Sequence, residues 1–439
     1  MNIQSTGKLN GFSEITSGAI KEAAEKFGTP LYLYDEKFIK DRCRLLLSMP
    51  SAYALTVRYA MKANSNRTFL KIIHSCGLKI DASSLNEAKR ANLAGIPYED
   101  IILTTQEVPE GVQMASLKEM IKGGLKYNAC SLRQLYNIGD FAAENKIKLA
   151  VRIHPGIGAG ESASRNTGDD YSCFGIHRSD FEKALNYANE KGIIFGHVHV
   201  HIGSGGSAAV WKANIDLELS ILEKYFRGAE TVSFGGGLKE ARMPYENAAD
   251  ITELGLYAKA QTEAFYQRTG RKLKTEIEPG TFIAANAGYA VTKVIDKKQT
   301  GANGLNFVIT DGGMEINARP LMYGSVHPFY AVSNGGGLLF SQFGENEGVN
   351  YSAAVIGRCC ESGDSQCLDE NGVNVARKIA EPEISDYIVI GGAGAYCSAM
   401  APMNYNSHLQ APEILFTEDK TFKVIRKRQT FDQLLENEV

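Results

Sequence analysis

The sequence predicts an α/β protein: a (β/α)8 barrel of the TIM type joined to a second, mostly antiparallel β domain of barrel or sandwich form. Three observations support this. From Tyr53 onward, short apolar stretches rich in branched residues alternate with longer amphipathic stretches. Eight such units follow one another, which is the number that closes a barrel. After Glu278 the apolar stretches are separated by Gly, Asn and Asp turns without a long helical period.

The predicted elements divide the 439 residues into two domains. The barrel strands are expected at residues 53–59, 79–81, 101–104, 126–128, 148–153, 194–201, 231–234 and 274–278. Amphipathic stretches that can cross back over a sheet lie at residues 85–94, 131–144, 180–190 and 251–268. Strands of the tail are expected at residues 290–295, 306–310, 351–356, 387–390 and 413–416. We assign residues 36–285 to the barrel. Residues 1–35 and 286–439 form the β domain, which the strand at residues 31–34 is expected to join.

The carboxyl ends of the strands are the catalytic face of such a barrel. Nearly every predicted strand ends in polar residues or glycine: Lys62, Asp81, Ser83, Thr104, Asn128, Arg152, His154, His201, Ser204, Gly235–Gly237, Glu278 and Gly280. This concentration predicts an active site at the mouth of the barrel.

Lys62 follows an apolar strand in YAMKANSN. Its amine is expected among barrel walls of low dielectric constant, which favour the uncharged, nucleophilic form. A solvated loop lysine is the alternative.

In HVHVHIGSGG, strand alternation places His197, His199 and His201 on one face. Three histidines could bind a metal, but no carboxylate lies nearby at ligand spacing, so we expect no metal and a ring-stacking role for His201.

Glycine-rich segments follow two of these strands. Ser204 and the backbone N–H groups of SFGGGL are suited to a phosphate, although a flexible turn has the same composition. Glu278, in EIEPGTF, can keep a pyridine nitrogen protonated, although a structural ion pair could also use it. Lysine, stacking histidine, phosphate loops and ring-nitrogen acid together predict a pyridoxal 5'-phosphate site.

The predicted β domain carries further candidates for acting on an amino acid. Cys360 could donate a proton to a carbanion, and Glu361 could bind an ammonium group. Arg319 and Tyr323, four residues apart, could bind a carboxylate. Tyr396 follows a glycine run and suits a phosphate. Each of these could instead be a satisfied surface group.

Composition narrows the class of protein. A net charge of -3 gives no general attraction to nucleic acid or to anionic lipid. No apolar run is long enough to span a membrane, and the N-terminus lacks the pattern of a secretory signal, so we expect a cytoplasmic protein. The eight cysteines contain no CxxC pair, and reduced thiols are the expectation.

These motifs resemble the pyridoxal phosphate decarboxylases of the alanine-racemase-like barrel fold, and within them the family that acts on diaminopimelate. The matching pieces, in family order over nearly the whole chain, are YAMKANSN, DASSLNEAKRA, RIHPGIGAG, HVHIGSG, SFGGGL, EIEPG, DGGMEINARPLMYGSVHP, CCESGD, GAYCSAMAPMNYNS and RKRQTFDQLL.

The resemblance implies decarboxylation of meso-2,6-diaminopimelate to L-lysine in a homodimer with active sites at the interface. It implies that Lys62 holds the cofactor, His201 stacks on its ring and Glu278 contacts the ring nitrogen. The remaining cofactor residues would be Asp81, Ser204, Gly236, Gly237, Gly280, Thr281 and Tyr396. Cys360 would be the proton donor. The substrate residues would be Arg319, Tyr323, Glu361 and Tyr396.

One position departs from the family pattern. The family usually has Arg after EPG, where it serves the distal carboxylate, and this chain has Thr281. A decarboxylase for lysine, ornithine or arginine therefore stays open, as does a racemase of the same fold. A non-catalytic regulatory protein and a metal-dependent barrel enzyme using His199 and His201 are more distant alternatives.

Overall fold

The computed structural model describes residues 7–157, 167–203 and 207–439. By its internal contacts the chain forms two compact units. One comprises residues 42–240 and 247–283, and the other comprises residues 1–41, 241–246 and 284–439. The predicted fold class is confirmed, because the first unit contains a closed barrel and the second contains a separate sheet.

Eight parallel strands close the barrel in chain order, and the last strand pairs with the first. The strands are β2 Leu55–Ala60, β3 Lys79–Ala82, β4 Ile101–Thr104, β5 Lys126–Ala129, β6 Leu149–Arg152, β7 Phe195–His199, β8 Thr231–Ser233 and β9 Lys274–Ile277. All eight predicted strands are confirmed, with bounds that differ by up to two residues.

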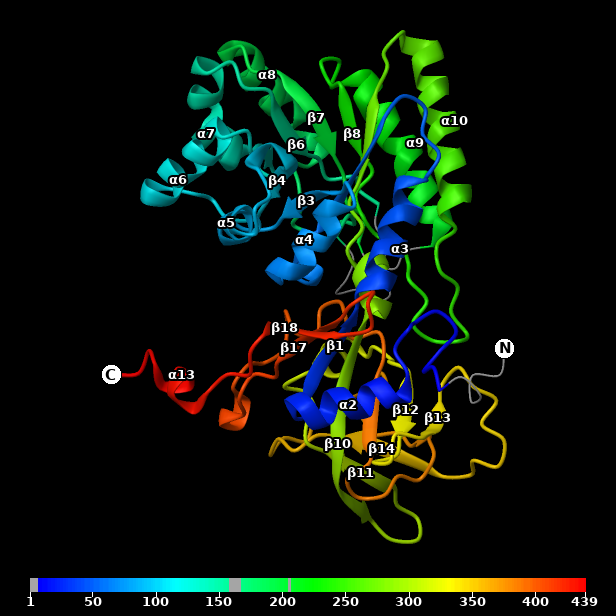
Figure 1. Ribbon diagram of the computed structural model, residues 1–439. Coiled ribbons are helices and arrows are strands. Elements are labelled where there is room, and N and C mark those ends of the chain that lie inside the picture. The colour runs from blue at the N-terminus through cyan, green and yellow to red at the C-terminus, as the bar shows by residue number, and fades with distance from the viewer. Residues whose placement is uncertain (1–6, 158–166, 204–206) are drawn as a thin grey trace. The chain divides into compact units, whose positions relative to one another are not determined.

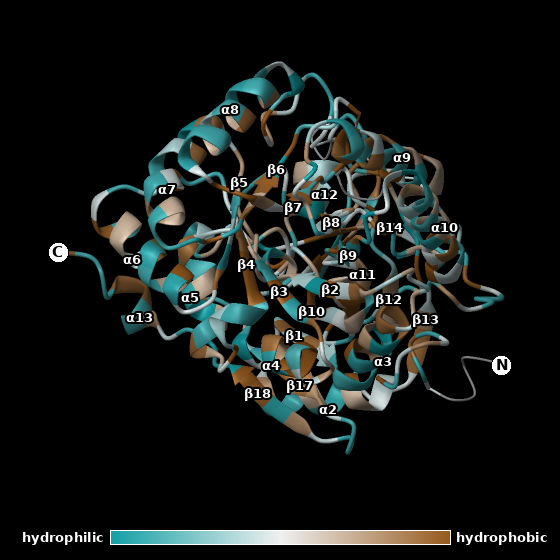
Figure 2. Ribbon diagram, turned by 90° about the horizontal axis from the view of Figure 1, so that it is seen from above, coloured by the Kyte–Doolittle hydropathy of each residue, from teal (hydrophilic) through white to brown (hydrophobic). Residues whose placement is uncertain are grey.

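A helix follows each of the first seven barrel strands (Figure 1). These helices are α4 Arg67–Ser75, α5 Leu85–Leu93, α6 Gly111–Lys122, α7 Leu132–Glu144, α8 Phe181–Lys191, α9 Ala208–Lys224 and α10 Ile251–Thr269. Ser84, Ser131 and Asp250 begin α5, α7 and α10, because each side chain accepts a bond from the backbone N–H three residues on. Gly192 and Gly270 end α8 and α10 in the left-handed region. Figure 2 shows α7 to α10 around the barrel strands, with hydrophilic residues on their outer sides.

The second unit contains a mixed, mostly antiparallel sheet in the order β13-β12-β16-β10-β1-β17-β18, which β11, β14 and β15 extend from β10. Its strands are β1 Leu31–Asp35, β10 Gly288–Gln299, β11 Asn306–Thr310, β12 Phe329–Val332, β13 Leu338–Ser341, β14 Ser352–Ile356, β15 Arg377–Lys378, β16 Tyr387–Ile390, β17 Glu413–Phe416 and β18 Phe422–Arg426. The N-terminal strand β1 joins this sheet, as predicted, between β10 and β17. The pairs β1·β17 and β11·β14 are parallel.

The described residues of this unit also form helix α2 Ser17–Phe27 before β1, helix α12 Arg319–Tyr323 between β11 and β12, and helix α13 Phe431–Leu435 after β18. Helix α2 contributes an apolar face to the core of this unit. Its Ile20 belongs to the same buried cluster as Leu33, Val291 and Val389 of the sheet. Helices α3 Glu36–Leu47 and α11 Thr281–Ala284 lie where the chain passes from one unit to the other. Among the helices of the described residues, none is both long and apolar enough to cross a bilayer.

Candidate active site at the mouth of the barrel

A cavity of about 320 Å³ opens at the carboxyl ends of the barrel strands. It is lined by Ala60, Lys62, Asp81, Ser83, Thr104, Thr105, Gln106, Glu107, Arg152, Phe174, His199, His201 and Glu278. Lys62, Asp81, His201 and Glu278, four of the predicted cofactor residues, therefore meet in one cavity although they come from four different strand ends. The volume is within the range of small-molecule sites.

Lys62 lies in a single 3-10 turn, Met61–Ala63, directly after β2. Met61 and Ala63 are buried, whereas the Lys62 side chain is exposed at the cavity opening, so the expected burial of its amine is wrong. The loop after β9 packs tightly on this turn, because a Cβ atom at Gly280 would lie 3.2 Å from the Ala60 carbonyl oxygen. This close approach, which glycine permits, brings the ends of β2 and β9 together.

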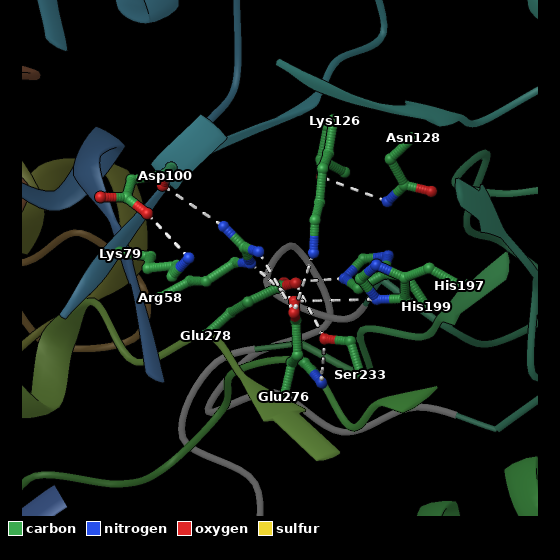
Figure 3. A network of polar contacts seen from close by, with 12 residues as sticks. Arg58, Lys79, Asp100, Lys126, Asn128, His197, His199, Ser233, Glu276 and Glu278 are labelled. Atoms are coloured by element: carbon green, nitrogen blue, oxygen red, sulfur yellow. Dashed lines mark hydrogen bonds and ion pairs between the residues drawn. The ribbon is translucent and has the colours of Figure 1, made fainter. Parts of the chain in front are cut away.

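Glu278 is 5% exposed, and each of its two carboxylate oxygens has a hydrogen-bond partner (Figure 3). Its Oε2 lies 2.7 Å from His199 Nε2, and its Oε1 accepts a 2.9 Å bond from the Ser233 hydroxyl. Burial acts to raise the pKa of Glu278, but the His199 ring and the Ser233 hydroxyl outweigh burial and hold the pKa well below its usual range. Glu278 is therefore an ionised carboxylate inside the barrel, suited to binding a cationic or protonated nitrogen.

His199 has a carboxylate neighbour that the sequence did not predict. No carboxylate lay near the three histidines in sequence, yet the barrel brings Glu278 from β9 into contact with His199. Strand β7 ends at His199, so His201 lies beyond the strand, where it lines the cavity. The pairing gives His199 a carboxylate partner for its Nε2.

His201 is held by the glycine segment that follows β8. Its Nδ1 accepts a 3.0 Å hydrogen bond from the Gly236 backbone N–H. The expectation that this N–H is free for an anion is therefore wrong. A Cβ atom at Gly236 would lie 2.5 Å from the Glu278 carbonyl oxygen and 3.1 Å from the His201 ring, so glycine is required for this packing. The same segment thus orients the ring and lets it approach β9.

Two buried charged side chains of the cavity wall, and also His199 at its Nδ1, have an unused hydrogen-bonding atom among the described residues. Asp81 Oδ1 and Arg152 Nη2 have no partner among the described residues, and both side chains are more than nine-tenths buried. Burial and the charge of Glu278 raise the pKa of Asp81 well above its ordinary value. Arg152 also lies over the Phe174 ring, 4.8 Å from its centroid. Buried polar atoms are normally paired, so this wall is complementary to a polar ligand.

The donor set fits pyridoxal phosphate. The cavity offers an amine for covalent attachment, an ionised carboxylate for a ring nitrogen, a histidine ring at its wall and a buried cation for an oxygen substituent. Ser204, predicted for the phosphate, lies outside the described residues. Gly237 is left-handed, with φ of 89°, and a side chain there would meet the Gly203 carbonyl oxygen. Thr281 is half-buried at the start of α11 and is not among the lining residues.

A second layer of charge lies deeper in the barrel (Figure 3). Arg58 and Glu276 form a bidentate ion pair, with Nε–Oε2 and Nη2–Oε1 distances of 2.6 and 3.1 Å. Both are buried, and Lys126 Nζ lies 3.5 Å from Glu276 Oε1. His197 Nε2 lies 3.9 Å from Glu276 Oε2. Barrel interiors are usually filled by Val, Ile and Leu, so this layer is an uncommon way to fill the core.

His197 gives this layer a pH dependence. Burial lowers the pKa of His197 to about 4, although Glu276 acts in the opposite direction. Between pH 6.5 and 4 the unfolded chain thus binds a proton that the folded chain does not, and stability falls as the pH falls through this window. We expect His197→Asn to remove on the order of 3 kcal/mol of this loss at pH 4. Urea unfolding of both proteins at pH 7 and pH 4.5 tests it, and parallel pH slopes for the two would contradict it.

The remaining predicted residues lie in the second unit. The buried Arg319 guanidinium lies 5.9 Å from the ring centroids of both Tyr323 and Tyr396. Its Nε donates a 3.3 Å bond to His327 Nε2. Arg319 begins the short helix α12 and does not lie on a loop. The arrangement presents one cation between two phenol rings, which suits a carboxylate or another anion.

Cys360 and Glu361 lie together on the turn after β14, and both side chains are exposed. The Cys360 N–H donates to Asn406 Oδ1 at 2.7 Å. Glu361 accepts bonds from the Gly363 N–H and from the hydroxyls of Ser362 and Tyr405, and these bonds lower the pKa of Glu361. It is therefore an ionised group that can bind an ammonium.

Sequence reasoning found the catalytic face but missed part of its wall. Arg152 and Thr104 were recognised as strand ends and given no role, and the loop with Thr105, Gln106 and Glu107 was not considered. For Arg152, Thr104 and the loop of residues 105–107, a position at the end of a barrel strand is the sequence feature that points to the cavity. Phe174 has no such signal, because it lies in a long loop between β6 and α8.

Comparison with known proteins agrees with this geometry. The family model described as pyridoxal-dependent decarboxylase, pyridoxal binding domain, matches residues 37–285, more than half of the chain. Diaminopimelate decarboxylase of Escherichia coli K12 is 31% identical over 426 residues, which cover 96% of this chain and 97% of that protein. A crystal structure of diaminopimelate decarboxylase is 30% identical, with a TM-score of 0.86 and coverage of 97% of both chains. The Helicobacter pylori diaminopimelate decarboxylase complexed with L-lysine is 25% identical, with a TM-score of 0.78 over 95% of this chain and 98% of that one.

The barrel, its cavity and the matching family model define the class, a pyridoxal phosphate-dependent amino-acid decarboxylase. Within that class, similarity to the curated relatives extends over nearly the full length of both chains. The chain belongs to the diaminopimelate decarboxylase family.

Proposed function

We propose that this protein decarboxylates meso-2,6-diaminopimelate to L-lysine and carbon dioxide, a step of lysine biosynthesis. The observation that carries the proposal is the buried, ionised Glu278 in the cavity that Lys62 also lines. When bound there, pyridoxal phosphate accepts the electron pair left on the substrate's α-carbon, and a protonated ring nitrogen strengthens it as an electron sink.

The proposal gives each residue a task at the cofactor or at the substrate, and Tyr396 serves both. The Lys62 amine holds the cofactor covalently, and Glu278 keeps a proton on the ring nitrogen while His199 and Ser233 hold the carboxylate in place. The His201 ring packs against the cofactor. The other cofactor contacts are assigned to Asp81, Ser204, Gly237, Gly280, Thr281 and Tyr396, while the Gly236 N–H orients the His201 ring.

The substrate residues belong to the second unit. Arg319 and Tyr323, with Tyr396, bind the distal carboxylate, and Glu361 binds the distal ammonium. The Cys360 thiol delivers a proton to the α-carbon after carbon dioxide has left.

We also propose a homodimer in which Cys360 and Glu361 act on the substrate bound to the partner subunit. Two apolar side chains that are 36–44% exposed lie beside this turn. Leu321 packs on Gly363, and the Tyr405 hydroxyl bonds to Glu361. Exposed apolar side chains beside two reactive groups suit an interface between identical subunits.

A decarboxylase for another diamino acid is the second candidate, because Thr281 stands where the family usually has Arg. A racemase fits the cavity less well, since ionised Glu278 favours a protonated ring nitrogen. Carbon dioxide release from meso-diaminopimelate, L-lysine, D-lysine, ornithine and arginine decides among them. We expect meso-diaminopimelate to be preferred, and a preference for lysine or ornithine would overturn the assignment.

Restoring the family residue should sharpen this preference. A charge-assisted hydrogen bond contributes about 1.5–3 kcal/mol, so Thr281→Arg is expected to raise selectivity for meso-diaminopimelate over L-lysine by roughly tenfold or more. The ratio of the two kcat/KM values measures it, with Thr281→Ser as the control. An unchanged ratio would show that position 281 does not contact the distal carboxylate.

A further inference from the structure

The turn that carries Cys360 and Glu361 is joined to the segment that leads to Arg319. Strands β11 and β14 are parallel neighbours, with Val308 beside Val355. Their carboxyl ends therefore send out two adjacent loops, residues 311–318 and residues 357–364. The first loop ends at Arg319, and the second contains Cys360 and Glu361.

The Asp364 carboxylate, 4% exposed, links these loops. Its Oδ1 accepts a 2.5 Å bond from the Met314 N–H in the first loop, and its Oδ2 accepts a 2.7 Å bond from the Cys359 N–H in the second. A Cβ atom at Gly313 or at Gly357 would overlap this carboxylate and the facing backbone. The two glycines thus let the backbones approach closely enough for one carboxylate to bridge them.

Neighbouring groups strengthen the link. Glu315 Oε2 accepts a 2.7 Å bond from the Gly313 N–H, and Glu315 Oε1 lies 3.3 Å from Arg358 Nε. Among the described residues, Glu315, Cys359 and Asp364 are also the group whose donor atoms lie close enough for a metal ion. Backbone N–H groups and Arg358 already occupy these carboxylates, so the cluster is built as a hydrogen-bonded clamp.

We propose that Asp364 is a positioning residue, which anchors the Cys360–Glu361 turn to the loop of residues 311–318 so that the proton donor and the ammonium ligand are held in place for the partner subunit's substrate. The inference rests on the proposed function, because it assigns a purpose to groups that the function uses. A loosened turn leaves the fold and the barrel cavity intact but misplaces the thiol and the ammonium ligand.

A second buried aspartate of the same unit provides a matched control. Asp386 is 5% exposed and accepts backbone bonds from the Asn334 N–H at 2.7 Å and the Glu383 N–H at 2.8 Å. It links the start of the β12–β13 turn to the segment before β16 and touches neither catalytic loop. Asp364→Asn and Asp386→Asn thus remove equivalent bonds at different places.

The test is kcat and KM for meso-diaminopimelate in the wild-type holoenzyme and both variants, with cofactor absorbance and urea unfolding as parallel readouts. We expect both variants to lose similar stability and keep the cofactor. Only Asp364→Asn should lose roughly 10- to 100-fold in kcat/KM, because small misplacements of reacting groups have effects of this size. A loss no larger than that of Asp386→Asn would overturn the proposal.

If Asp364→Asn does not fold, the Glu315→Gln variant tests the positioning role of this hydrogen-bonded cluster instead. It retains the side-chain shape and an acceptor for the Gly313 N–H, so a smaller loss of kcat/KM, roughly three- to tenfold, is expected with normal stability. Unchanged kinetics in this variant would contradict the clamp. A wild-type enzyme that releases no carbon dioxide from any diamino acid would instead reject the proposed function.

Discussion

Glu278→Gln is expected to lower kcat/KM for decarboxylation by roughly 10²- to 10³-fold while the protein still binds pyridoxal phosphate. Glutamine has the shape of glutamate but no negative charge, so it cannot hold a proton on the cofactor's ring nitrogen. His199 and Ser233 now stabilise the carboxylate from its two oxygens, and both would face a neutral amide. Steady-state kinetics and the visible absorbance of the bound cofactor test the prediction.

Glu218→Gln is the matched control for this experiment. Glu218 is a second buried glutamate of the barrel unit, 1% exposed, on helix α9. Burial and the charge of Glu278 raise the pKa of Glu218 well above its ordinary value, and Glu218 is not among the residues that line the cavity. Its amide variant should keep activity within about twofold. If Glu278→Gln is equally mild, the carboxylate does not serve the ring nitrogen.

Arg58→Met is expected to cost about 3–5 kcal/mol of unfolding free energy, the range for breaking a buried ion pair from one side. Glu276 would lose its bidentate partner in the barrel interior and keep only Lys126, 3.5 Å away with a half-exposed side chain, and His197, 3.9 Å away. A loss of this size is a large part of the stability of a typical protein. Urea unfolding at pH 7 measures it.

The double variant Arg58→Met with Glu276→Leu separates charge from packing. Apolar residues of similar volume can replace a buried ion pair with little loss or a gain of stability, so the double variant should recover most of the stability that the single variant loses. Equal stability of the single and double variants would show that the cost is one of packing and not of an unpaired carboxylate.

The barrel could be predicted from the sequence because its strands carry a local signal. Each is a short run bounded by turns, and three of the helices between them, α5, α7 and α10, begin at a serine or aspartate cap. Strands β12, β13, β15 and β18 were not predicted. The first two are four residues each, and β18 is a polar edge strand whose pairing with β17 decides its conformation.

Strand ends also identified Lys62, Asp81, His201 and Glu278, since the architecture gathers them whatever their separation in the chain. The partners of these residues could not be found in this way. His199 and Glu278 are 79 residues apart, and Arg58 and Glu276 are 218 apart, so only the closed barrel brings each pair together. Close contacts made by the backbone cannot be predicted from the sequence either. The hydrogen bond from the Gly236 N–H to His201 Nδ1 is an example.

The most direct test of the account is to locate the lysine that holds the cofactor. Purified holoenzyme is reduced with sodium borohydride, which fixes the covalent link, and its peptides are mapped by mass spectrometry. The account predicts a pyridoxyl group on Lys62, at the mouth of the barrel beside Glu278. A pyridoxyl group on another lysine of an active enzyme would contradict it.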